Sequence, residues 1–377
     1  MHSSNHPNNP QRICHIISGD LWAGAEAQVY HLINELSGIK SLTVSVIVFN
    51  DGILAKKLKL REIKTTIVNE HNKPFFSFLR ELCKELKAVK PDIIHVHGYK
   101  EAIIGGLAGR ICGLDKLIRT HHGKGVLDGS LKHRILEFFI ARFLIKWNIA
   151  VSEDLKKFLI EKGIAKEINI RVIHNGIATQ EIVCRKSRRV LKQELGISQD
   201  AFVIGTLGRM VAVKGHSYFL EGAKQVKALK PNVIFVLAGD GPLKADAMNF
   251  IQQERLDETV KLLGFRNDPY DLLNMFDIFA LTSLHEGIPM VLLEAMSLEK
   301  PIVATSVGGI PEILTNRDTA LLIEPTNSFL FAKACVELIE NTRFRETIAK
   351  NAKNKLLENY TININAQKAM ALYEEAA

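Results

Sequence analysis

Short apolar runs rich in valine and isoleucine alternate with segments of helical periodicity along almost the whole chain. Such runs, bounded by turn-forming residues, are typical of strands, whereas apolar residues spaced three and four apart are typical of helices. In the first half the pattern predicts strands over residues 13–18, 43–49, 65–68, 92–95, 117–120, 148–151 and 170–173. It predicts helices over residues 25–36, 75–89, 101–112, 132–146 and 153–162. Strand and helix therefore follow one another in regular alternation.

These strands lack the apolar–polar alternation of a sheet with one face in water. A strand without that alternation is buried on both faces, which requires helices on both sides of a parallel sheet. Repeated alternation of strand and helix gives the doubly wound α/β class. We therefore expect a Rossmann-like domain in the first half of the chain.

The alternation stops over residues 175–200, a polar stretch that contains four closely spaced basic residues, and then restarts. The second half predicts strands over residues 202–207, 233–238, 260–263, 278–281, 302–304 and 320–323. The two halves thus resemble two copies of one architecture. Ligands of such sheets bind beyond the carboxyl ends of the strands, so two sheets facing each other across a cleft are expected to hold the site.

After Phe329 the pattern is helical to the end, which is too long for the last crossover of one domain. We expect the final helix to cross back and brace the first domain. The predicted division is an N-terminal domain over residues 1–180, a linker over 181–200, a C-terminal domain over 201–358 and a returning C-terminal helix over 359–377.

Composition places the chain among ordinary globular proteins. Its 377 residues are 47% hydrophobic and 24% charged, which excludes disordered and fibrous classes. No apolar run reaches the roughly 18 residues of a membrane span. The first ten residues are polar and lack the apolar stretch of a signal peptide. The five cysteines are scattered without a CxxC pair, which predicts free thiols and a cytoplasmic protein.

The net charge of +8 is unevenly distributed. Residues 1–180 hold 26 Lys and Arg against 17 Asp and Glu, whereas residues 181–377 hold 23 against 24. The first half is therefore expected to be attracted to anionic lipid or other polyanions, although a basic surface without such a partner is the alternative.

The residues that follow the predicted strand 278–281 form a candidate anion site. Glu286 and Gly287 lead through Ile288 and Pro289 into a helix that we expect to begin at Met290. Gly287 lets the backbone approach a ligand closely, and proline suits the first helical position. The free N–H groups of a helix start bind anions without side chains.

Glu294 lies inside the same predicted helix, within an apolar stretch. Two carboxylates beside an anion site are expected to bind something other than the anion, and sugar hydroxyls are suitable partners. The alternative is that Glu286 interacts only with the helix dipole and that Glu294 is a solvated surface residue.

Upstream, the predicted strand 202–207 ends in Gly208 and Arg209, and Lys214 and Gly215 follow. Arginine binds phosphate through its planar fork and lysine as a point charge, so the two side chains could hold a diphosphate. Alone, these two cations would be weak evidence.

Together these motifs resemble those of the group 1 glycosyltransferases, which are retaining, nucleotide-sugar-dependent enzymes of the GT-B fold. The resemblance covers the second half of the chain and is carried by Gly208-Arg209 with Lys214-Gly215, Ala238-Gly239-Asp240-Gly241-Pro242, Gly264-Phe265, Glu286-Gly287-Ile288-Pro289 with Glu294-Ala295, and Gly308-Gly309-Ile310-Pro311-Glu312.

The resemblance implies a role for each matching position. Arg209 and Lys214 would bind the donor diphosphate, and Glu294 would hold the nucleotide ribose. Glu286 would contact the transferred sugar, and the backbone of Gly287, Ile288, Pro289 and Met290 would meet the phosphates or the sugar. The C-terminal domain would thus bind the nucleotide-sugar and the N-terminal domain the acceptor.

In the first half, the resemblance points to two loops. Gly24 stands where the family has a glycine-rich loop beside the diphosphate, although this loop is poorer in glycine than is typical. Near it, Asp20 and Trp22 are candidates for the acceptor pocket. The strand 117–120 is followed by His121 and His122, and the family places a histidine near the reacting sugar here. His122 matches by position, with His121 as the alternative because neighbouring residues of a strand point in opposite directions.

His95 and His97 invite a metal interpretation, but no third ligand is spaced to join them, so we expect them to line the cleft. The chain also has no Asp-x-Asp motif for a metal on a sugar diphosphate. We therefore expect no metal and no cofactor, with the leaving group stabilised by Arg209, Lys214 and the helix start.

The segment 132–147 combines basic residues with an apolar stretch that ends in Trp147. A basic amphipathic helix can lie on an anionic membrane, and an ordinary packing helix is the equal alternative.

We therefore expect a metal-independent, retaining glycosyltransferase of the hexosyltransferase type. It would move a sugar from a nucleotide-sugar, with UDP favoured over GDP or ADP, to an acceptor hydroxyl in the synthesis of polysaccharide, lipopolysaccharide or glycolipid. The expected acceptor is a carbohydrate or a lipid-linked molecule, the expected location is cytoplasmic or peripheral at the inner membrane face, and no nucleic acid is expected as a partner. The alternatives are a nucleotide-sugar epimerase of the same fold and a non-catalytic sugar-nucleotide-binding protein.

Overall fold

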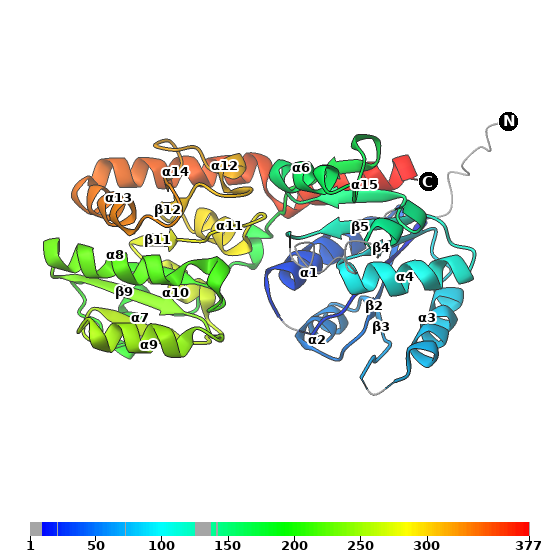
Figure 1. Cartoon of the computed structure of the whole chain (residues 1–377), viewed down its shortest axis with the longest axis horizontal. Coiled ribbons are helices and arrows are strands. Elements are labelled where there is room, and N and C mark those ends of the chain that lie inside the picture. The colour runs from blue at the N-terminus through cyan, green and yellow to red at the C-terminus, as the bar shows by residue number, and fades with distance from the viewer. Residues whose placement is uncertain (1–9, 21, 72, 125–136, 141, 377) are drawn as a thin grey trace. The chain divides into compact units, whose positions relative to one another are not determined.

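The computed structural model describes residues 10–20, 22–71, 73–124, 137–140 and 142–376. It divides into two compact units (Figure 1). Unit 1 comprises Met1–Gly176 together with Ile362–Ala377, and unit 2 comprises Ile177–Thr361. Each unit is an open parallel sheet covered by helices on both faces, which confirms the doubly wound fold in both halves of the chain.

Unit 1 is built on a seven-stranded parallel sheet in the order β3-β2-β1-β4-β5-β6-β7. Its strands are β1 (Gln11–Ile17), β2 (Leu42–Val48), β3 (Lys64–Ile67), β4 (Ile93–Val96), β5 (Leu117–His121), β6 (Trp147–Ala150) and β7 (Ile170–Val172). Its described helices are α1 (Gly24–Ser37), α2 (Ile53–Leu60), α3 (Phe75–Val89), α4 (Tyr99–Ile111), α6 (Glu153–Glu161) and α15 (Ile362–Ala376). Every predicted strand of this half is present.

Neighbouring residues of the central strand β1 pack on opposite faces of this sheet. Ile16 belongs to the apolar cluster made with α3 and α4, and Ile17 belongs to the cluster made with α1 and α2. This distribution explains why the strand sequences show no polar alternation, since both faces are buried.

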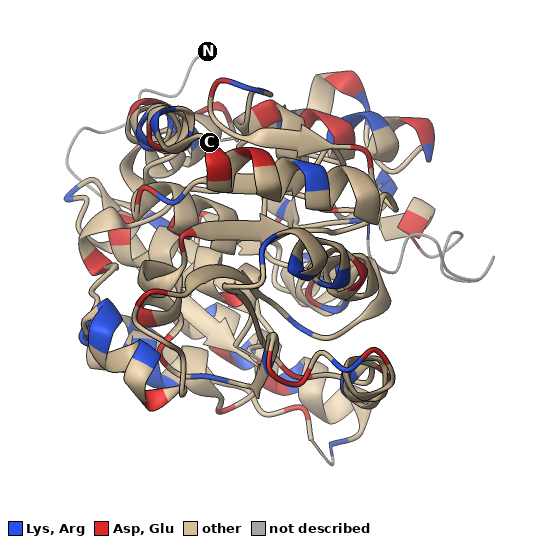
Figure 2. Cartoon of the chain, turned by 90° about the vertical axis from the view of Figure 1, so that its left-hand side faces the viewer, with Lys and Arg blue, Asp and Glu red and all other residues tan. Residues whose placement is uncertain are grey.

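Unit 2 repeats the arrangement with six parallel strands in the order β10-β9-β8-β11-β12-β13. The strands are β8 (Phe202–Leu207), β9 (Val233–Ala238), β10 (Val260–Gly264), β11 (Ile278–Leu281), β12 (Ile302–Thr305) and β13 (Leu321–Ile323). The helices are α7 (Arg188–Glu194), α8 (His216–Leu229), α9 (Lys244–Gln253), α10 (Pro269–Met275), α11 (Met290–Ser297), α12 (Ile310–Ile313), α13 (Ser328–Glu340) and α14 (Thr342–Asn359). Acidic and basic residues are interspersed along the helices (Figure 2), in keeping with the near-neutral charge of the second half.

Two segments differ from the sequence pattern. Residues 53–60 form α2, which the pattern does not indicate because only three of its residues are buried. Residues 181–200 lie in unit 2 and contain α7, whose Leu191 is fully buried. Asp271 of α10 anchors the start of this segment by accepting hydrogen bonds from the backbone N–H groups of Arg185 and Lys186, at 2.6 and 3.0 Å. Four closely spaced basic residues of this segment thus lie at the surface of unit 2; they are Arg185, Lys186, Arg188 and Arg189.

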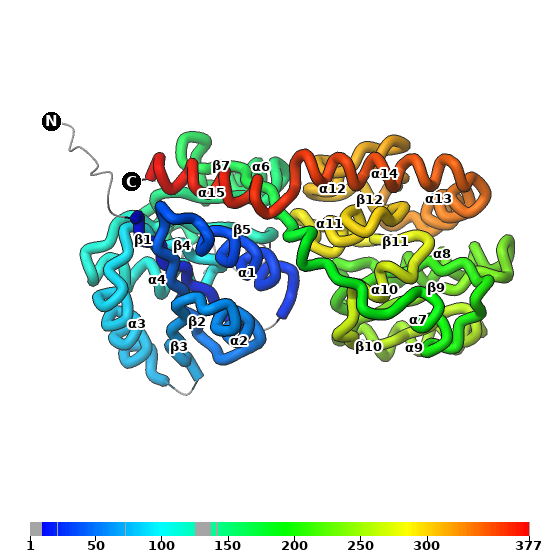
Figure 3. The backbone as a smooth tube through the Cα atoms, turned by 180° about the vertical axis from the view of Figure 1, so that it is seen from behind, coloured from blue at the N-terminus to red at the C-terminus, as the bar shows by residue number. Residues whose placement is uncertain are grey.

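The last helix, α15, leaves unit 2 and completes unit 1, as the sequence predicts. It lies beside α1 (Figure 3). Asn365 joins the two helices by accepting a hydrogen bond from the amide nitrogen of Gln28 at 3.0 Å, and it donates to the backbone oxygen of His174 at 2.7 Å. Leu372 and Tyr373 on the same helix are almost fully buried.

The burial of α15 makes a stability prediction. We expect Leu372→Ala to lower the free energy of unfolding of unit 1 by about 2–5 kcal/mol, because Leu372 is 2% exposed and truncation leaves a cavity in a packed core. Urea denaturation followed by circular dichroism measures this change. Leu60→Ala is the matched control, since Leu60 is 83% exposed and its truncation should change stability by less than about 0.5 kcal/mol. Equal effects of the two substitutions would contradict the packing of α15.

Candidate functional site

The candidate residues of unit 2 lie on loops that leave two neighbouring strands. Arg209 follows β8, and Glu286 follows β11, which pairs with β8 in the sheet. Because parallel strands end at the same edge, the loops after β8 and β11 meet there.

Lys214 and Glu286 form an ion pair, with 2.6 Å between the Lys214 Nζ and the Glu286 Oε1 atoms. Ser283 donates a hydrogen bond to the same carboxylate oxygen at 2.6 Å. Both charged side chains are largely buried, with 20% of Lys214 and 10% of Glu286 exposed. The carboxylate therefore fixes the ammonium group beside the loop that leads into α11. Ser283 was not foreseen from the sequence, where its only signal is its position three residues before Glu286.

Two glycines allow these loops to approach each other. Gly215 has a φ of +61°, and a Cβ atom there would lie 2.1 Å from the backbone oxygen of Thr282. Gly308 has a φ of +54°, and a Cβ atom there would lie 1.9 Å from the backbone oxygen of Glu286. A side chain at either position would clash with the loop after β11 and would also strain the backbone. The glycine motifs thus bring loop backbones together around Glu286.

Helix α11 begins at Met290, as predicted, with Pro289 as the residue immediately before it. Proline therefore stands one position earlier than expected, where its extended backbone leads into the helix. In the described structure no side chain caps this helix start. The backbone of the first turn thus has its partial positive charge directed at the loop that contains Gly287 and Ile288.

Glu294 lies on α11 between the buried Leu293 and Ala295 and is itself only partly exposed. Desolvation raises the pKa of the Glu294 carboxyl to about 7. A carboxyl group with this pKa is partly protonated at neutral pH, so it can both donate and accept hydrogen bonds. Hydroxyl groups of a ligand are suitable partners for such a group.

Arg209 is exposed at the end of β8. Its backbone oxygen is within 3.1 Å of the His216 Nε2 atom, which ties the loop to the start of α8. Within the described residues no carboxylate pairs with its guanidinium group. The structure thus pairs Lys214 with Glu286 and leaves the charge of Arg209 in solvent.

In unit 1, the two adjacent histidines at the end of β5 have different surroundings. His121 is buried in the sheet, and its Nε2 atom is 2.9 Å from the Asn148 Oδ1 atom on β6. Both ring nitrogens of His122 are buried without a hydrogen-bond partner among the described residues. Desolvation lowers the pKa of His122 to about 4, so its ring is neutral at pH 7. His121 is therefore held by the sheet, whereas His122 keeps both nitrogens for other partners.

Gly24 is the first residue of α1. The carboxylate of Glu26 accepts a hydrogen bond from the backbone N–H of Ala23 at 3.2 Å and so closes the first turn. Trp22 lies under the ammonium group of Lys57, 4.8 Å from the ring centroid.

A polar cluster at the ends of β1, β2 and β3 was not foreseen from the sequence, apart from Asp20. Lys100 forms ion pairs with Glu70 at 2.7 Å and with Asp20 at 3.7 Å, and Asn50 donates to Glu70 at 2.9 Å. These residues come from four separate segments, and no local motif joins them. The cluster gives unit 1 a set of hydrogen-bonding groups at the same edge of the sheet as Gly24 and His122.

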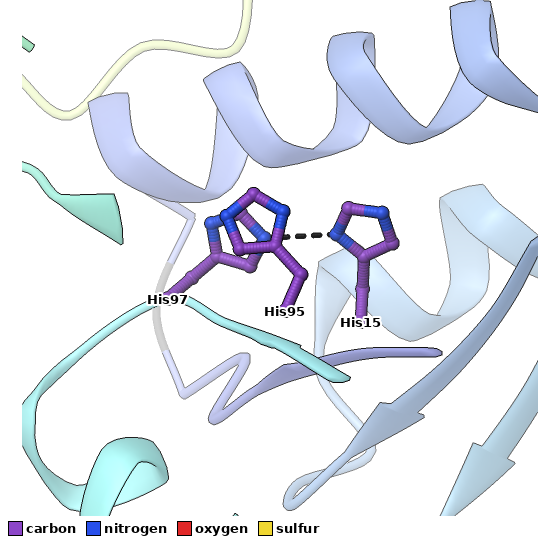
Figure 4. Close-up of side chains that lie close together, drawn as sticks. All are labelled: His15, His95 and His97. Carbon is purple, nitrogen blue, oxygen red and sulfur yellow. Dashed lines mark hydrogen bonds between the residues drawn. The ribbon is translucent and has the colours of Figure 1, made fainter. Parts of the chain in front are cut away.

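Three histidines lie close together at the centre of unit 1 (Figure 4). His15 of β1 joins His95 and His97, so the expectation that no third ligand joins this pair is wrong. The sequence could not reveal it, because β1 and β4 are separated by about eighty residues but pair in register at His15 and His95. Their ring nitrogens lie within 4.8 Å of one another, close enough for a metal ion to be considered.

The hydrogen bonds of these rings fit a hydrogen-bonded network better than a metal site. The His15 Nδ1 and His97 Nε2 atoms are 2.9 Å apart and hydrogen-bonded, with one of the two nitrogens donating (Figure 4). The two nitrogens of His95 are each 2.7 Å from a hydroxyl oxygen, one of Tyr373 and one of Thr120. Since the two nitrogens of an imidazole point in divergent directions, the remaining nitrogens of His15 and His97 point away from their shared bond. His15 and His97 are therefore hydrogen-bonded to each other, and His95 is hydrogen-bonded to two hydroxyl groups.

Among the described residues, no helix has both the length and the hydrophobicity that crossing a membrane requires. The described part of the segment 132–147 presents Phe138, Phe139 and Phe143 with 56, 52 and 54% of their surfaces exposed. Residues 132–136 and 141 of that segment lie outside the described residues.

Two family models match the chain. Residues 187–355 match the model for glycosyl transferases group 1, and residues 22–181 match the model for glycosyltransferase family 4. The chain is 31% identical over 304 residues to a UDP-Gal:alpha-D-GlcNAc-diphosphoundecaprenol alpha-1,3-galactosyltransferase of Escherichia coli, with 78% of each chain covered. It is 27% identical over 345 residues to the capsular polysaccharide biosynthesis glycosyltransferase CapM of Staphylococcus aureus, covering 87% of this chain and 88% of that one.

Solved structures share the fold. The crystal structure of HepE from Anabaena in complex with UDP and glucose superposes with a TM-score of 0.87 at 23% identity, and 97% of this chain and 100% of that chain are covered. The crystal structure of TarM superposes with a TM-score of 0.77 at 15% identity. Both similarities support the GT-B architecture.

The pKa of Glu294 makes a pH-dependent prediction. Because the folded-state pKa of about 7 lies above the ordinary value of 4.5, the folded protein binds a proton more tightly than the unfolded chain. The contribution of Glu294 to stability should therefore fall as pH rises from about 4.5 to 7 and stay low above that range. We expect Glu294→Gln to stabilise the protein relative to wild type at pH 8 and to leave stability nearly unchanged at pH 4.5.

Urea denaturation at the two pH values measures this difference. Glu299→Gln is the control, since Glu299 follows the same helix but is exposed. A gain for Glu294→Gln that is the same at both pH values would contradict a carboxyl group with a raised pKa.

Proposed function

Because the chain belongs to the group 1 glycosyl transferases, we propose that it transfers a sugar from a UDP-sugar to an acceptor hydroxyl with retention at the anomeric carbon. The proposed setting is the synthesis of cell-surface polysaccharide, lipopolysaccharide or glycolipid. The observation that carries the proposal is the Lys214–Glu286 ion pair at the entrance to α11, with Ser283 on the same carboxylate. This arrangement combines a fixed cation, a helix start and a hydrogen-bond acceptor in one loop cluster.

Each element has a proposed task in donor binding. Lys214, Arg209 and the start of α11 neutralise the diphosphate, and the backbone from Gly287 to Met290 supplies N–H groups. Glu286 accepts hydrogen bonds from the transferred sugar, and Glu294 binds the ribose hydroxyls. Gly24 at the start of α1 and His122 after β5 contribute from unit 1.

Retention follows from a substitution on one face of the sugar. The bond between the anomeric carbon and the diphosphate oxygen breaks, the acceptor oxygen bonds to the anomeric carbon, and the acceptor proton passes to the departing phosphate oxygen. A double displacement would need a free carboxylate as nucleophile. Glu286 is the candidate for this nucleophile, but its carboxylate is already bonded to Lys214 and Ser283, which lowers its nucleophilicity.

The choice of UDP rests on relatives. The E. coli relative is named for UDP-Gal, and the HepE structure holds UDP and glucose. The proposed reaction uses no metal, because Lys214, Arg209 and the start of α11 supply the positive charge that the leaving diphosphate needs. Activity should therefore persist in EDTA.

We also propose that unit 1 contacts an anionic membrane at the inner face through Phe138, Phe139 and Phe143. The three rings are adjacent, with centroids of Phe139 and Phe143 6.0 Å apart, and each exposes about half of its surface. The E. coli relative acts on a diphosphoundecaprenol-linked sugar, according to its name. Such an acceptor lies in a membrane, so an enzyme that uses one gains from a membrane-contacting surface.

The proposed diphosphate contacts predict the effect of removing each cation. We expect Lys214→Ala and Arg209→Ala each to lower kcat by roughly 10²- to 10³-fold, the scale of a lost transition-state stabiliser. The assay measures UDP release from UDP-sugars with lipid-linked and carbohydrate acceptors. Lys227→Ala is the control, since Lys227 lies on α8 and donates a hydrogen bond to the backbone oxygen of Arg255.

Wild-type kcat in either of the first two variants would contradict the proposed diphosphate site. Conversion of the UDP-sugar without any acceptor would favour an epimerase, and donor binding without transfer to any tested acceptor would favour a non-catalytic binding protein.

The aromatic surface makes a separate prediction. Replacing Phe138, Phe139 and Phe143 with serine should weaken binding to vesicles that contain phosphatidylglycerol by more than about tenfold. The reason is that binding no longer transfers three aromatic rings from water into the membrane. Co-sedimentation measures the bound fraction. Phe76→Ser is the control, since Phe76 on α3 is 81% exposed. Equal vesicle binding by the triple variant and wild type would exclude this surface as the membrane contact.

A further inference from the structure

We infer that Tyr373 of the last helix is a positioning residue for His122, acting through His95, Thr120 and one buried water molecule. This inference rests on the proposed role of His122 in sugar transfer. It extends that proposal by making α15 part of the machinery that holds the histidine.

The first part of this network, from Tyr373 to Thr120, consists of two short hydrogen bonds. The Tyr373 hydroxyl oxygen lies 2.7 Å from the His95 Nδ1 atom, and the His95 Nε2 atom lies 2.7 Å from the Thr120 Oγ1 atom. Tyr373 and His95 are fully buried, and Thr120 is 6% exposed. Hydrogen bonds that are shielded from water in this way are stronger and constrain the geometry of their partners.

The direction of the protons follows from the chemistry of the groups. Burial lowers the pKa of His95 well below its ordinary value, and His15 and His122 nearby lower it further, so the ring is neutral and carries one N–H. One hydroxyl must then donate to the ring while the other accepts from it. A phenol is a better donor than an aliphatic alcohol, so the Tyr373 O–H donates to Nδ1. The Nε2–H of His95 donates to Thr120, which leaves the Thr120 O–H as a donor for the next group.

His122, which follows Thr120 in the network, lies across a small cavity from it. His95, His97, Thr120 and His122 line a cavity of about 20 Å³ within unit 1, together with residues of α1 and α15. This volume fits one water molecule, which needs two to four polar partners. The His97 Nδ1 atom and both ring nitrogens of His122 are buried without a partner among the described residues. A water molecule that accepts from Thr120 and donates to His122 and His97 satisfies the His97 Nδ1 atom and one of the two His122 nitrogens, and leaves the other His122 nitrogen for a ligand.

The backbone of β5 explains why this arrangement controls His122. Thr120 and His122 line the same cavity, whereas His121, the last residue of β5, points to the other face, because neighbouring residues of a strand point to opposite faces. Thr120 is held by His95 and Tyr373 on its face, and His121 is held by Asn148 at 2.9 Å on the opposite face. The end of β5 is thus fixed from both sides. Because the water donates to one nitrogen of His122, that nitrogen carries no proton and the other nitrogen does.

His15 supports the same network. Its Nδ1 atom is 2.9 Å from the His97 Nε2 atom, and the two rings are stacked with an angle of 11° between their planes. This contact orients the other nitrogen of His97. The histidines that could be considered for a metal therefore act as orienting groups for the cavity.

The test uses the full-length protein with ¹⁵N-labelled histidine. Ring-nitrogen NMR shifts report which nitrogen of His122 is protonated, and His122→Gln assigns the signal. The variants are Tyr373→Phe and Thr120→Val, which remove hydroxyl groups and keep the packing, and Thr120→Ser, which restores the hydroxyl. Tyr30→Phe is the matched control, because Tyr30 is a buried tyrosine of unit 1 whose hydroxyl contacts Arg61 at 3.1 Å, outside this network.

We expect Tyr373→Phe and Thr120→Val to change the ring-nitrogen shifts of His122 and to lower kcat by about 3- to 10-fold with the KM for donor unchanged, the effect of one lost hydrogen bond. Thr120→Ser should restore both properties, and Tyr30→Phe should alter neither. Unchanged His122 shifts in both hydroxyl-deleted variants would overturn the inference. So would a stoichiometric Zn²⁺ ion that shifts His15, His95 and His97 together.

The NMR measurement needs no turnover, so it separates the inference from the proposed function. If wild type transfers no sugar but His122 responds to Tyr373→Phe and Thr120→Val, the positioning network stands and the proposed function fails. If transfer occurs but His122 does not respond, the proposed function stands and the network fails.

Discussion

The organisation of both units depends on the parallel direction of their strands. In a parallel sheet all carboxyl ends lie at one edge, and every connection to the next strand must return across a face. Loops from distant parts of the chain therefore meet at one edge. The loops after β8 and β11 bring Lys214 to Glu286, although 72 positions separate them. In unit 1 the same geometry brings His15, His95 and Thr120 together from three neighbouring strands.

Around α11, burial and charge act in opposite directions on two carboxyl groups. Glu286 is largely buried, yet Lys214 and Ser283 satisfy its oxygen. Glu294, eight positions later, has apolar neighbours, and desolvation raises its pKa to about 7. One helix thus carries a compensated charge before its start and an uncompensated carboxyl group inside it. A ligand with hydroxyl groups offsets the desolvation of the Glu294 carboxyl group by hydrogen bonding to it. A negative charge on the same ligand offsets the partial positive charge at the start of α11.

The local pattern of the sequence was sufficient for most of the fold. Strands such as β8 and β11 were predicted with the correct bounds, because each is a short, mostly apolar run that ends at polar or turn-forming residues. Helix α2 was not predicted, because it buries only one narrow face. The basic residues at the start of α7 read as a linker in the sequence, but contacts with Asp268, Asp271 and Asp277, each more than 80 positions away, attach this segment to unit 2.

The candidate site was predictable where a motif is local and hidden where the partner is distant. Glu286, Gly287 and Met290 follow one strand, so their proximity can be read directly. The pairing of Glu286 with Lys214 requires the order of strands in the sheet, which no local pattern contains. His15 and Tyr373 are the clearest examples of partners that the sequence does not reveal. They lie on a strand near one end of the chain and a helix near the other, and both are neighbours of His95.

The discontinuity of unit 1 also bears on how the protein is made. Unit 2 is one uninterrupted segment, so it can fold as soon as its own residues have left the ribosome. Unit 1 starts earlier but lacks α15 until the rest of the chain has been translated. During that interval the surface of α1 and the histidines around His95 remain uncovered. The domain synthesised first is therefore the one completed last, and it is the one more exposed to chaperones or to aggregation while translation continues.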